Sequence, residues 1–426
     1  MNDTFKSVCF LGFGASNRAL YEHLLPLGCD FFVHAKEPCT LENGICGVFG
    51  ENYLYCPYDI IFRSPSVRPD SIVTSGAISS ECKYAFEKIT APKICITGSD
   101  GKTTCSTLIN RVLLTKYSSF LGGNIGNPLV NAIGLKHDFL VCELSSFQLM
   151  DFAPSCDVAL ITNITPNHLN WHKSMVEYKN AKLNILKNAK RRVLCYDDME
   201  LREHILPGYT TVFSLNDISS LDIDRVYLKN DYIYHCDKRL MHKSQILLRG
   251  SFNLLNVMAS IACTYPYVDT NELVCALCSF TGVKNRCEFV KKLGDVSFFN
   301  SSIDTTPHRT IATLSAFDAS NVVIILGGAD KNLSYECLGS ALSNVRYAVL
   351  LGQSKDKILP HLKCKSVVVN SLYEAVHCAY SLAKPSGVVL LSPACTSFDM
   401  FESYEHRGAE FIKLVTELCR TDFKKF

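Results

Sequence analysis

The sequence predicts an α/β protein built from three domains, and three observations support this prediction. The 426 residues correspond to about three domains at a typical ~150 residues each. Short apolar runs alternate with helical stretches along the chain, which is typical of parallel sheets covered by helices. A glycine-rich loop of the kind that binds phosphate lies between one such run and a helix.

The charge balance argues against a dedicated nucleic-acid-binding protein. The chain carries 43 Lys and Arg residues against 41 Asp and Glu residues, which leaves a formal charge of +2, whereas such a protein needs a basic surface. The content of 47% hydrophobic and 20% charged residues is that of a globular protein. No apolar run approaches the ~20 residues that cross a bilayer, so we expect no membrane insertion.

The 21 cysteines are unusually many for this length. Their odd number, the lack of a secretory signal at the start and their scattered positions in apolar runs argue against a disulfide framework. The single CxxC pair, Cys275 and Cys278, has no second pair with which to bind zinc. We therefore expect cysteine to serve mainly as a small buried hydrophobic residue in a reducing cytoplasm.

The first predicted domain covers residues 1–90. A predicted strand at 8–11 leads into the turn Gly12-Phe-Gly14-Ala15-Ser16-Asn17 and a helix, and further strands are predicted at 31–33 and 58–62. The turn lacks the third glycine of a dinucleotide fingerprint, and no clear acid closes the second strand, which disfavours a hydride-transfer enzyme. A site for a phosphate-bearing ligand at the helix start stays open, as does a plain strand-to-helix turn.

The second predicted domain covers residues 91–282 and begins with an alternation of strands and helices. Short strands follow between about 190 and 250, with Asn230-Asp231 forming a tight hairpin, and a helix begins at Ser251. Its larger strands are predicted at residues 93–97, 139–144 and 158–164.

The third predicted domain covers residues 283–426 and is again α/β. Each of its strands runs into a loop rich in Gly, Ser, Thr or Asp, and open α/β sheets bind ligands at the carboxyl ends of their strands. The strands are predicted at residues 296–299, 321–326, 347–351 and 387–392.

The strongest local signal is the run Gly98-Ser99-Asp100-Gly101-Lys102-Thr103-Thr104, which follows the strand at 93–97 and precedes a helix expected to begin at Cys105. Glycines let backbone amides face a phosphate, the lysine neutralises its oxygens, and the hydroxyl after the lysine can bind magnesium. Ile96 occupies the place of the first glycine in the general phosphate-loop motif. The alternative is a glycine turn with a solvated lysine.

Two further polar residues follow predicted strands. Glu143 and His168 each lie beyond an apolar strand, where a carboxylate beside a phosphate loop suits a magnesium ligand. Taken singly, Glu143 could be a charge at a helix N-terminus and His168 an ordinary loop histidine.

Eight motifs appear in the order and spacing of the Mur ligases, so the chain resembles that family. The C-terminal motif makes the resemblance strongest to its D-glutamate-adding members. The motifs are GSDGKTT, ELSSFQL, ITNITPNHLNWH, YKNAKLNI, SFNLLN, NRCEFV, LGGADKN and LLSPACTSFDMFESYEHRG.

This resemblance implies a Rossmann-like N-terminal domain for a UDP-linked substrate, a central P-loop domain for ATP and a Rossmann-like C-terminal domain. It implies an ATP-dependent carboxylate–amine ligase that adds D-glutamate to UDP-N-acetylmuramoyl-L-alanine through an acyl phosphate, in peptidoglycan precursor synthesis. The expected cofactors are ATP and two Mg²⁺ ions. The expected partners are small molecules only, and the expected form is a cytoplasmic monomer.

The resemblance also assigns roles to single residues. Lys102 would contact the γ-phosphate, Thr103 and Glu143 would hold one magnesium, and His168 would hold the second together with a carbamylated Lys182. By its position alone, Lys182 could equally be a solvated helix lysine. The ATP-binding residues would be Gly98 to Thr104, Asn253, Asn256 and Arg286. The substrate-binding residues would be Gly14, Ala15, Ser16, Lys36, Ser64, Asn124, Ser145, Thr305, Lys331, Ser397 and Tyr404.

Two alternatives stay open, and departures of the sequence from the family pattern motivate the second of them. One is a sister Mur ligase or a folylpolyglutamate-synthase-like ligase. The other is a nucleotide-binding paralogue without catalysis. The departures are Asn167 and Asn300-Ser301 in place of aspartate, Ser66 in place of glycine and Tyr404 in place of phenylalanine.

Overall fold

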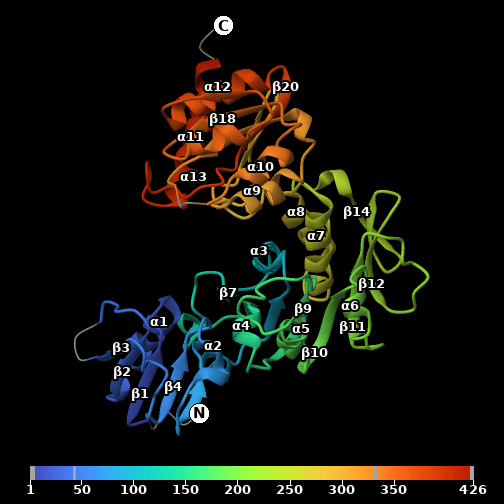
Figure 1. The fold of residues 1–426 in the computed structure, drawn as a ribbon. Coiled ribbons are helices and arrows are strands. Elements are labelled where there is room, and N and C mark those ends of the chain that lie inside the picture. The colour runs from blue at the N-terminus through green and yellow to red at the C-terminus, as the bar shows by residue number, and fades with distance from the viewer. Residues whose placement is uncertain (1–4, 42–44, 331–332, 423–426) are drawn as a thin grey trace. The chain divides into compact units, whose positions relative to one another are not determined.

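The computed structural model describes residues 5–41, 45–330 and 333–422, with side chains up to Leu418. The chain forms two compact units, one of residues 1–243 and 255–277 and the other of residues 244–254 and 278–426. The described residues form three separate sheets (Figure 1). Each sheet falls within one of the three predicted domains, whose limits at 90 and 282 stay a prediction. No described helix combines the length and the apolar character needed to span a membrane.

The first sheet is parallel and has the order β3-β2-β1-β4-β5. Because side chains alternate along a strand, Phe10 of β1 packs with α1 and α2 on one face, while Cys9 and Leu11 face a smaller core on the other. The elements are β1 Ser7–Leu11, α1 Ala15–Leu24, β2 Asp30–Ala35, β3 Cys46–Phe49, β4 Ile60–Arg63, β5 Ala77–Ser79 and α2 Glu81–Lys88.

The second sheet has the order β14-β13-β12-β11-β10-β9-β6-β8-β7. It is parallel from β7 to β12 and antiparallel in its last two strand pairs. Asn230 and Asp231 both have positive φ, which confirms the predicted hairpin. The strands are β6 Lys93–Thr97, β7 Ser119–Gly123, β8 Phe139–Glu143, β9 Ser155–Ile161, β10 Asn188–Cys195, β11 Thr210–Ser214, β12 Asp224–Lys229, β13 Tyr232–His235 and β14 Lys238–His242.

The helices that follow these strands are mostly short, and one prediction about them is wrong. Helix α3 begins at Lys102 and not at Cys105, because the left-handed Gly101 already forms its N-cap. The predicted helix start at Ser251 is confirmed. The helices are α3 Lys102–Leu113, α4 Ser146–Leu149, α5 Met175–Leu183, α6 Met199–Arg202, α7 Ser251–Thr264 and α8 Thr270–Cys278.

The third sheet has the order β15-β16-β20-β17-β18-β19 and is parallel except for the β15–β16 pair. Alternate residues of β17 enter two cores, one closed by α12 and α13 and the other by α10. The elements are β15 Glu288–Leu293, β16 Asp295–Asn300, α9 Pro307–Leu314, β17 Val322–Gly327, α10 Glu336–Ala341, β18 Tyr347–Leu351, α11 Lys355–Ile358, β19 Ser366–Val368, α12 Leu372–Ala383, β20 Ser386–Leu391 and α13 Tyr404–Asp422.

Candidate active site

The glycine loop between β6 and α3 forms a tight turn. Gly98 has φ +150° and Gly101 has φ +81°, conformations that favour glycine. A Cβ atom at Gly98 would overlap the Thr162 hydroxyl, and one at Gly101 would overlap the Asn256 side-chain oxygen. The loop therefore brings its backbone close to two neighbouring segments and delivers the amides of the α3 N-terminus, which attract anions.

The middle of this loop forms hydrogen bonds with the segment that follows β9. The Ser99 hydroxyl lies 2.8 Å from the Tyr178 hydroxyl, and it donates to the Thr165 carbonyl over 2.8 Å. The Asp100 amide donates to Asn163 Oδ1 over 3.0 Å, and Asn163 Nδ2 donates to the Asp100 carbonyl over 3.1 Å. These bonds give Ser99 and Asp100 a positioning role in the loop.

Two lysines point into the loop. Lys102 Nζ donates to the carbonyls of Gly98 and Ser99 over 2.8 and 2.9 Å, and Lys182 Nζ donates to Gly98 over 2.6 Å. Lys182 is 2% exposed, which excludes a solvated helix lysine. Burial first, and then the charge of Lys102, hold the pKa of Lys182 well below its usual range. The Lys182 amine is therefore easily deprotonated.

Glu143 ends β8, the strand beside β6, and its carboxylate is 2% exposed. Oε1 accepts a hydrogen bond from Asn124 Nδ2 over 3.0 Å, and the Asn124 amide donates to the Glu143 carbonyl over 2.8 Å. Oε2 is buried and has no hydrogen-bond partner among the described residues. Burial of a carboxylate oxygen without a partner destabilises the folded chain unless a cation binds the oxygen. Glu143 therefore fits a magnesium ligand. Thr103, in the first turn of α3, follows the loop lysine.

His168 follows β9, the strand on the other side of β6. Its backbone has φ +54°, and its amide donates to Asn167 Oδ1 over 2.8 Å. The side-chain oxygen of Asn167 thus accepts the hydrogen bond that closes this turn. Partial burial and then the charges of Lys102 and Lys182 lower the pKa of His168. The imidazole is therefore neutral at pH 7, which is the form that binds metal ions.

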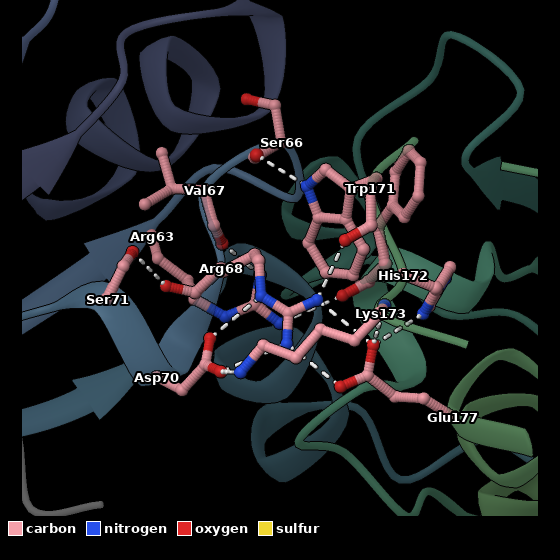
Figure 2. Close-up of polar contacts among 11 residues, drawn as sticks. Arg63, Ser66, Val67, Arg68, Asp70, Ser71, Trp171, His172, Lys173 and Glu177 are labelled. Atoms are coloured by element: carbon pink, nitrogen blue, oxygen red, sulfur yellow. Dashed lines mark hydrogen bonds and ion pairs between the residues drawn. The ribbon is translucent and has the colours of Figure 1, made fainter. Parts of the chain in front are cut away.

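The loop that follows β4 forms hydrogen bonds with the segment that follows His168. Arg68 donates to the Trp171 carbonyl over 2.8 Å and to the Glu177 carboxylate over 2.9 Å, and Trp171 Nε1 donates to the Ser66 carbonyl over 2.8 Å (Figure 2). The Arg68 guanidinium lowers the pKa of Glu177 to about 2. The roles of Arg68, Trp171 and Glu177 were not predicted from the sequence, because each pair of partners lies more than 100 residues apart.

The N-terminal substrate candidates lie around the glycine turn after β1. Gly14 is the N-cap of α1 and so comes directly before Ala15 and Ser16. A Cβ atom on Gly12 would lie 2.8 Å from Ser64 Cβ, so Ser64 is next to this turn. Lys36, beyond the end of β2, is exposed. Ser145 instead caps α4, where it forms a capping box with Gln148.

The other candidates lie in the second unit. The exception is Asn256, whose side-chain oxygen lies at Gly101. Asn253 also lies on α7 and donates to the Arg249 carbonyl over 2.7 Å. Lys331 lies outside the described residues. The remaining candidates of this unit are Arg286, Thr305, Ser397 and Tyr404.

Arg407, which was not predicted from the sequence, bonds the segment around Ser302 to the segment around Thr396. Arg407 is 2% exposed and donates to Ser302 Oγ and to the carbonyls of Ser302, Cys395 and Thr396 over 2.8–3.1 Å. Ser302 Oγ donates to the Tyr404 carbonyl over 2.8 Å. Arg407 thus positions the loop that carries Ser397, next to the start of α13.

Asn300 and Ser301, where the family pattern has aspartate, bond within the second unit. Both are fully buried. Asn300 Nδ2 donates to Asn285 Oδ1 over 2.9 Å, and Ser301 Oγ accepts from the Cys287 amide over 3.1 Å. The two side chains therefore contribute to the packing of β16 against the segment before β15.

Comparison with known proteins identifies the family of the chain. The Mur ligase middle domain family matches residues 96–264. UDP-N-acetylmuramoylalanine–D-glutamate ligases of Clostridium tetani and Clostridium botulinum (strain Langeland) are each 37% identical to the chain, over 97% of both proteins.

The fold is shared with solved structures at low sequence identity. UDP-N-acetylmuramate–alanine ligase from Thermotoga maritima has a TM-score of 0.59 at 20% identity, covering 96% of this chain and 99% of its own. A pseudomurein peptide ligase from Methanothermus fervidus has a TM-score of 0.57 at 16% identity, covering 97% and 100%. The two Clostridium ligases are 37% identical to the chain over 97% of both proteins, and the chain therefore belongs to the Mur ligase family.

Proposed function

We propose that the chain is an ATP-dependent ligase that joins D-glutamate to UDP-N-acetylmuramoyl-L-alanine in peptidoglycan precursor synthesis. The observation that carries the proposal is the 37% identity over 97% of a relative of that name. The phosphate loop supports it, because Glu143 ends one of the two strands that flank β6 and His168 follows the other.

The reaction begins with phosphoryl transfer. An oxygen of the alanyl carboxylate attacks the γ-phosphorus of ATP, the bond to the β-phosphate oxygen breaks, and ADP leaves an acyl phosphate. The D-glutamate amine then attacks the acyl carbon, loses a proton, and the tetrahedral intermediate expels inorganic phosphate. Lys102 and the amides at the start of α3 counter the negative charge on the transferred phosphoryl group.

Thr103 and Glu143 would hold one magnesium ion, and His168 and Lys182 would hold a second. Bound there, the ions would neutralise phosphate oxygens during the transfer. The unpartnered Glu143 oxygen and the neutral His168 ring suit this role.

Lys182 would serve as a carbamate. A neutral amine can add to carbon dioxide with loss of one proton, which replaces an ammonium group with an oxygen anion. The lowered pKa of Lys182 supports this step, because the neutral amine is the reactive form. The anion would also remove the repulsion between Lys182 and Lys102.

The remaining assignments rest on the resemblance to the family. Gly14, Ala15, Ser16, Lys36 and Ser64 would bind the UDP-linked substrate, with Asn124 and Ser145 nearer the phosphate loop. Asn253, Asn256 and Arg286 would bind the nucleotide. Thr305, Lys331, Ser397 and Tyr404 would bind D-glutamate, because a cation and hydroxyl groups suit two carboxylates. A monomer in the cytoplasm is part of this proposal.

Phosphate release from ATP tests the proposal. We expect release only when UDP-N-acetylmuramoyl-L-alanine and D-glutamate are both present, with L-glutamate, L-lysine and D-alanine inactive. The Lys102→Ala variant, with an unchanged circular dichroism spectrum, should lose this release. Use of another amino acid would instead indicate a sister ligase. ATP binding without any product under saturating substrates would indicate a paralogue without catalysis.

A further inference from the structure

Two thiols and an imidazole meet on the face of the first sheet that carries the smaller core. Cys9 lies in the middle of β1, His34 in β2, and Cys56 in the segment that precedes β4. Their exposed fractions are 0%, 2% and 0%. Cys9 Sγ lies 3.8 Å from Cys56 Sγ, and Cys56 Sγ lies 3.5 Å from His34 Nδ1. We call these three residues the Cys9 cluster.

The spacing of these atoms is that of ligands around one metal ion. Zinc binds sulfur at about 2.3 Å and imidazole nitrogen at about 2.0–2.1 Å in a tetrahedron. The edges of such a tetrahedron are about 3.8 Å between two sulfurs and about 3.5 Å between sulfur and nitrogen. The two measured separations agree with these edges, and all three ligand atoms lie within 4.8 Å of one another.

The surroundings of the Cys9 cluster also suit a bound cation. The Tyr53 carbonyl oxygen lies 3.1 Å from His34 Nδ1 and 3.6 Å from Cys56 Sγ, where it can complete the ligand set. The Tyr58 hydroxyl lies 3.0 Å from His34 Nε2 and can fix the ring, as outer partners of metal-bound histidines do. Apolar side chains, among them Leu11 and Ile61, close the site.

We propose that Cys9, His34 and Cys56 bind a thiophilic cation, Zn²⁺ or Cu(I). Two thiolates and one imidazole are ligands that both ions favour. On binding, the two thiols release their protons, His34 binds through Nδ1, and its Nε2–H donates to the Tyr58 hydroxyl. The ion would tie β1, β2 and the segment before β4 together. The site uses none of the residues assigned to the ligase reaction, so a test of this site is independent of a test of the proposed function.

The test must distinguish the Cys9 cluster from a second group of potential ligands, Asp224, His235 and Cys236. Asp224 Oδ1 lies 2.8 Å from His235 Nε2 and 3.4 Å from Cys236 Sγ, but these side chains are partly exposed and offer one thiol. A Cys236→Ser variant removes that thiol and leaves the Cys9 cluster unchanged. It is therefore the matched control for Cys9→Ser and Cys56→Ser.

The experiment is a titration of the full-length chain, reduced and stripped of metal by a chelator, with Co²⁺ as the optical probe. We expect about one Co²⁺ per chain with a thiolate-to-cobalt absorption band, displacement of the band by Zn²⁺, and the same band in Cys236→Ser. Cys9→Ser and Cys56→Ser should lose the band. If Cu(I), added in a parallel titration, binds once per chain with the same dependence on Cys9 and Cys56 while Co²⁺ does not, the ion is copper.

Two outcomes would overturn the proposal. One is a wild-type chain that takes up neither Co²⁺ nor Cu(I) at this stoichiometry, a result that needs no variant and is independent of how the variants fold. The other is a band that persists in Cys9→Ser and disappears in Cys236→Ser, which would place the ion at the other group.

Discussion

Lys102 and Lys182 donate hydrogen bonds to the same oxygen, the Gly98 carbonyl, over 2.8 and 2.6 Å. Two ammonium groups so close repel each other, and the buried one is also deprived of water. The arrangement concentrates positive potential at the loop, which suits a site for a triphosphate. It also makes the buried Lys182 ammonium group a source of instability.

Replacement of Lys182 by methionine should abolish ligase activity and, at neutral pH, raise Tm above that of the wild-type chain freed of carbon dioxide, in which Lys182 is not carbamylated. The folded-state pKa of Lys182 is lowered from 10.5, so the unfolded chain binds the proton more tightly and stability rises with pH up to about that value. Methionine removes this effect, and Lys102 still satisfies the Gly98 carbonyl. Differential scanning calorimetry should show the Tm difference shrinking as the pH approaches 10.5.

The exposed Lys187 provides the control for this prediction. Lys187→Met should leave both Tm and activity unchanged. A Lys182→Met variant that melts below the wild type at neutral pH would show that the buried ammonium is stabilising, against the prediction.

Replacement of Glu143 by glutamine should lower the rate of phosphate release by about 10²-fold or more and raise the Mg²⁺ concentration needed for activity. Glutamine keeps the acceptor for Asn124 but removes the charge that would meet the ion. Steady-state rates across a Mg²⁺ series measure both effects. Glu203→Gln, at a side chain that is 62% exposed, is the control. An unchanged Mg²⁺ dependence in Glu143→Gln would remove Glu143 from the metal site.

The pair Arg68 and Glu177 should stabilise the first unit. A double-mutant cycle with Arg68→Ala and Glu177→Ala, followed by urea unfolding, should give a coupling of about 0.5–3 kcal/mol at pH 7. The pKa of Glu177 falls from 4.5 to about 2 on folding, so this stabilisation is complete above pH 4.5 and is lost as the pH falls toward 2.

The more exposed pair Lys179 and Glu200 serves for comparison, with an expected coupling of about 0–1 kcal/mol. Equal coupling in the two pairs would mean that Arg68 contributes no more than a surface ion pair.

Replacement of Arg407 by lysine should destabilise the second unit by about 2–4 kcal/mol, because one ammonium cannot reach the four acceptors that the guanidinium bonds. Chemical denaturation of the full chain measures this loss, and KM for D-glutamate should rise as the Ser397 loop loosens. The exposed Arg309 offers the matched change, Arg309→Lys, which should leave stability unchanged. A stable Arg407→Lys variant with normal KM would refute this role.

Local patterns predicted the elements whose signal is contained in a few neighbouring residues. The apolar run of β6, the phosphate loop and the Asn230-Asp231 hairpin were all predicted from short-range chemistry. Strand β7, which contains two glycines, and strand β3, which is short and largely exposed, lack that signal and were missed.

Contacts between distant segments could not be predicted from spacing. Glu177 lies 109 residues from Arg68, and Arg407 lies 105 residues from Ser302. Cysteine spacing likewise argued against a zinc site, whereas the parallel pairing of β1 with β2 brings Cys9 and His34 within reach of Cys56. The strand order of the sheets, and not the linear motif, decides these neighbours.

The bond from Lys182 to the Gly98 carbonyl crosses 84 residues, and this has a consequence for synthesis of the chain on the ribosome. The phosphate loop emerges long before its second lysine, so a nascent chain passes through a stage with Lys102 alone beside the turn. Strands β8 and β9 must also be added before the loop has its neighbours on both sides. A growing polypeptide therefore cannot hold a complete phosphoryl-transfer site until α5 has left the exit tunnel.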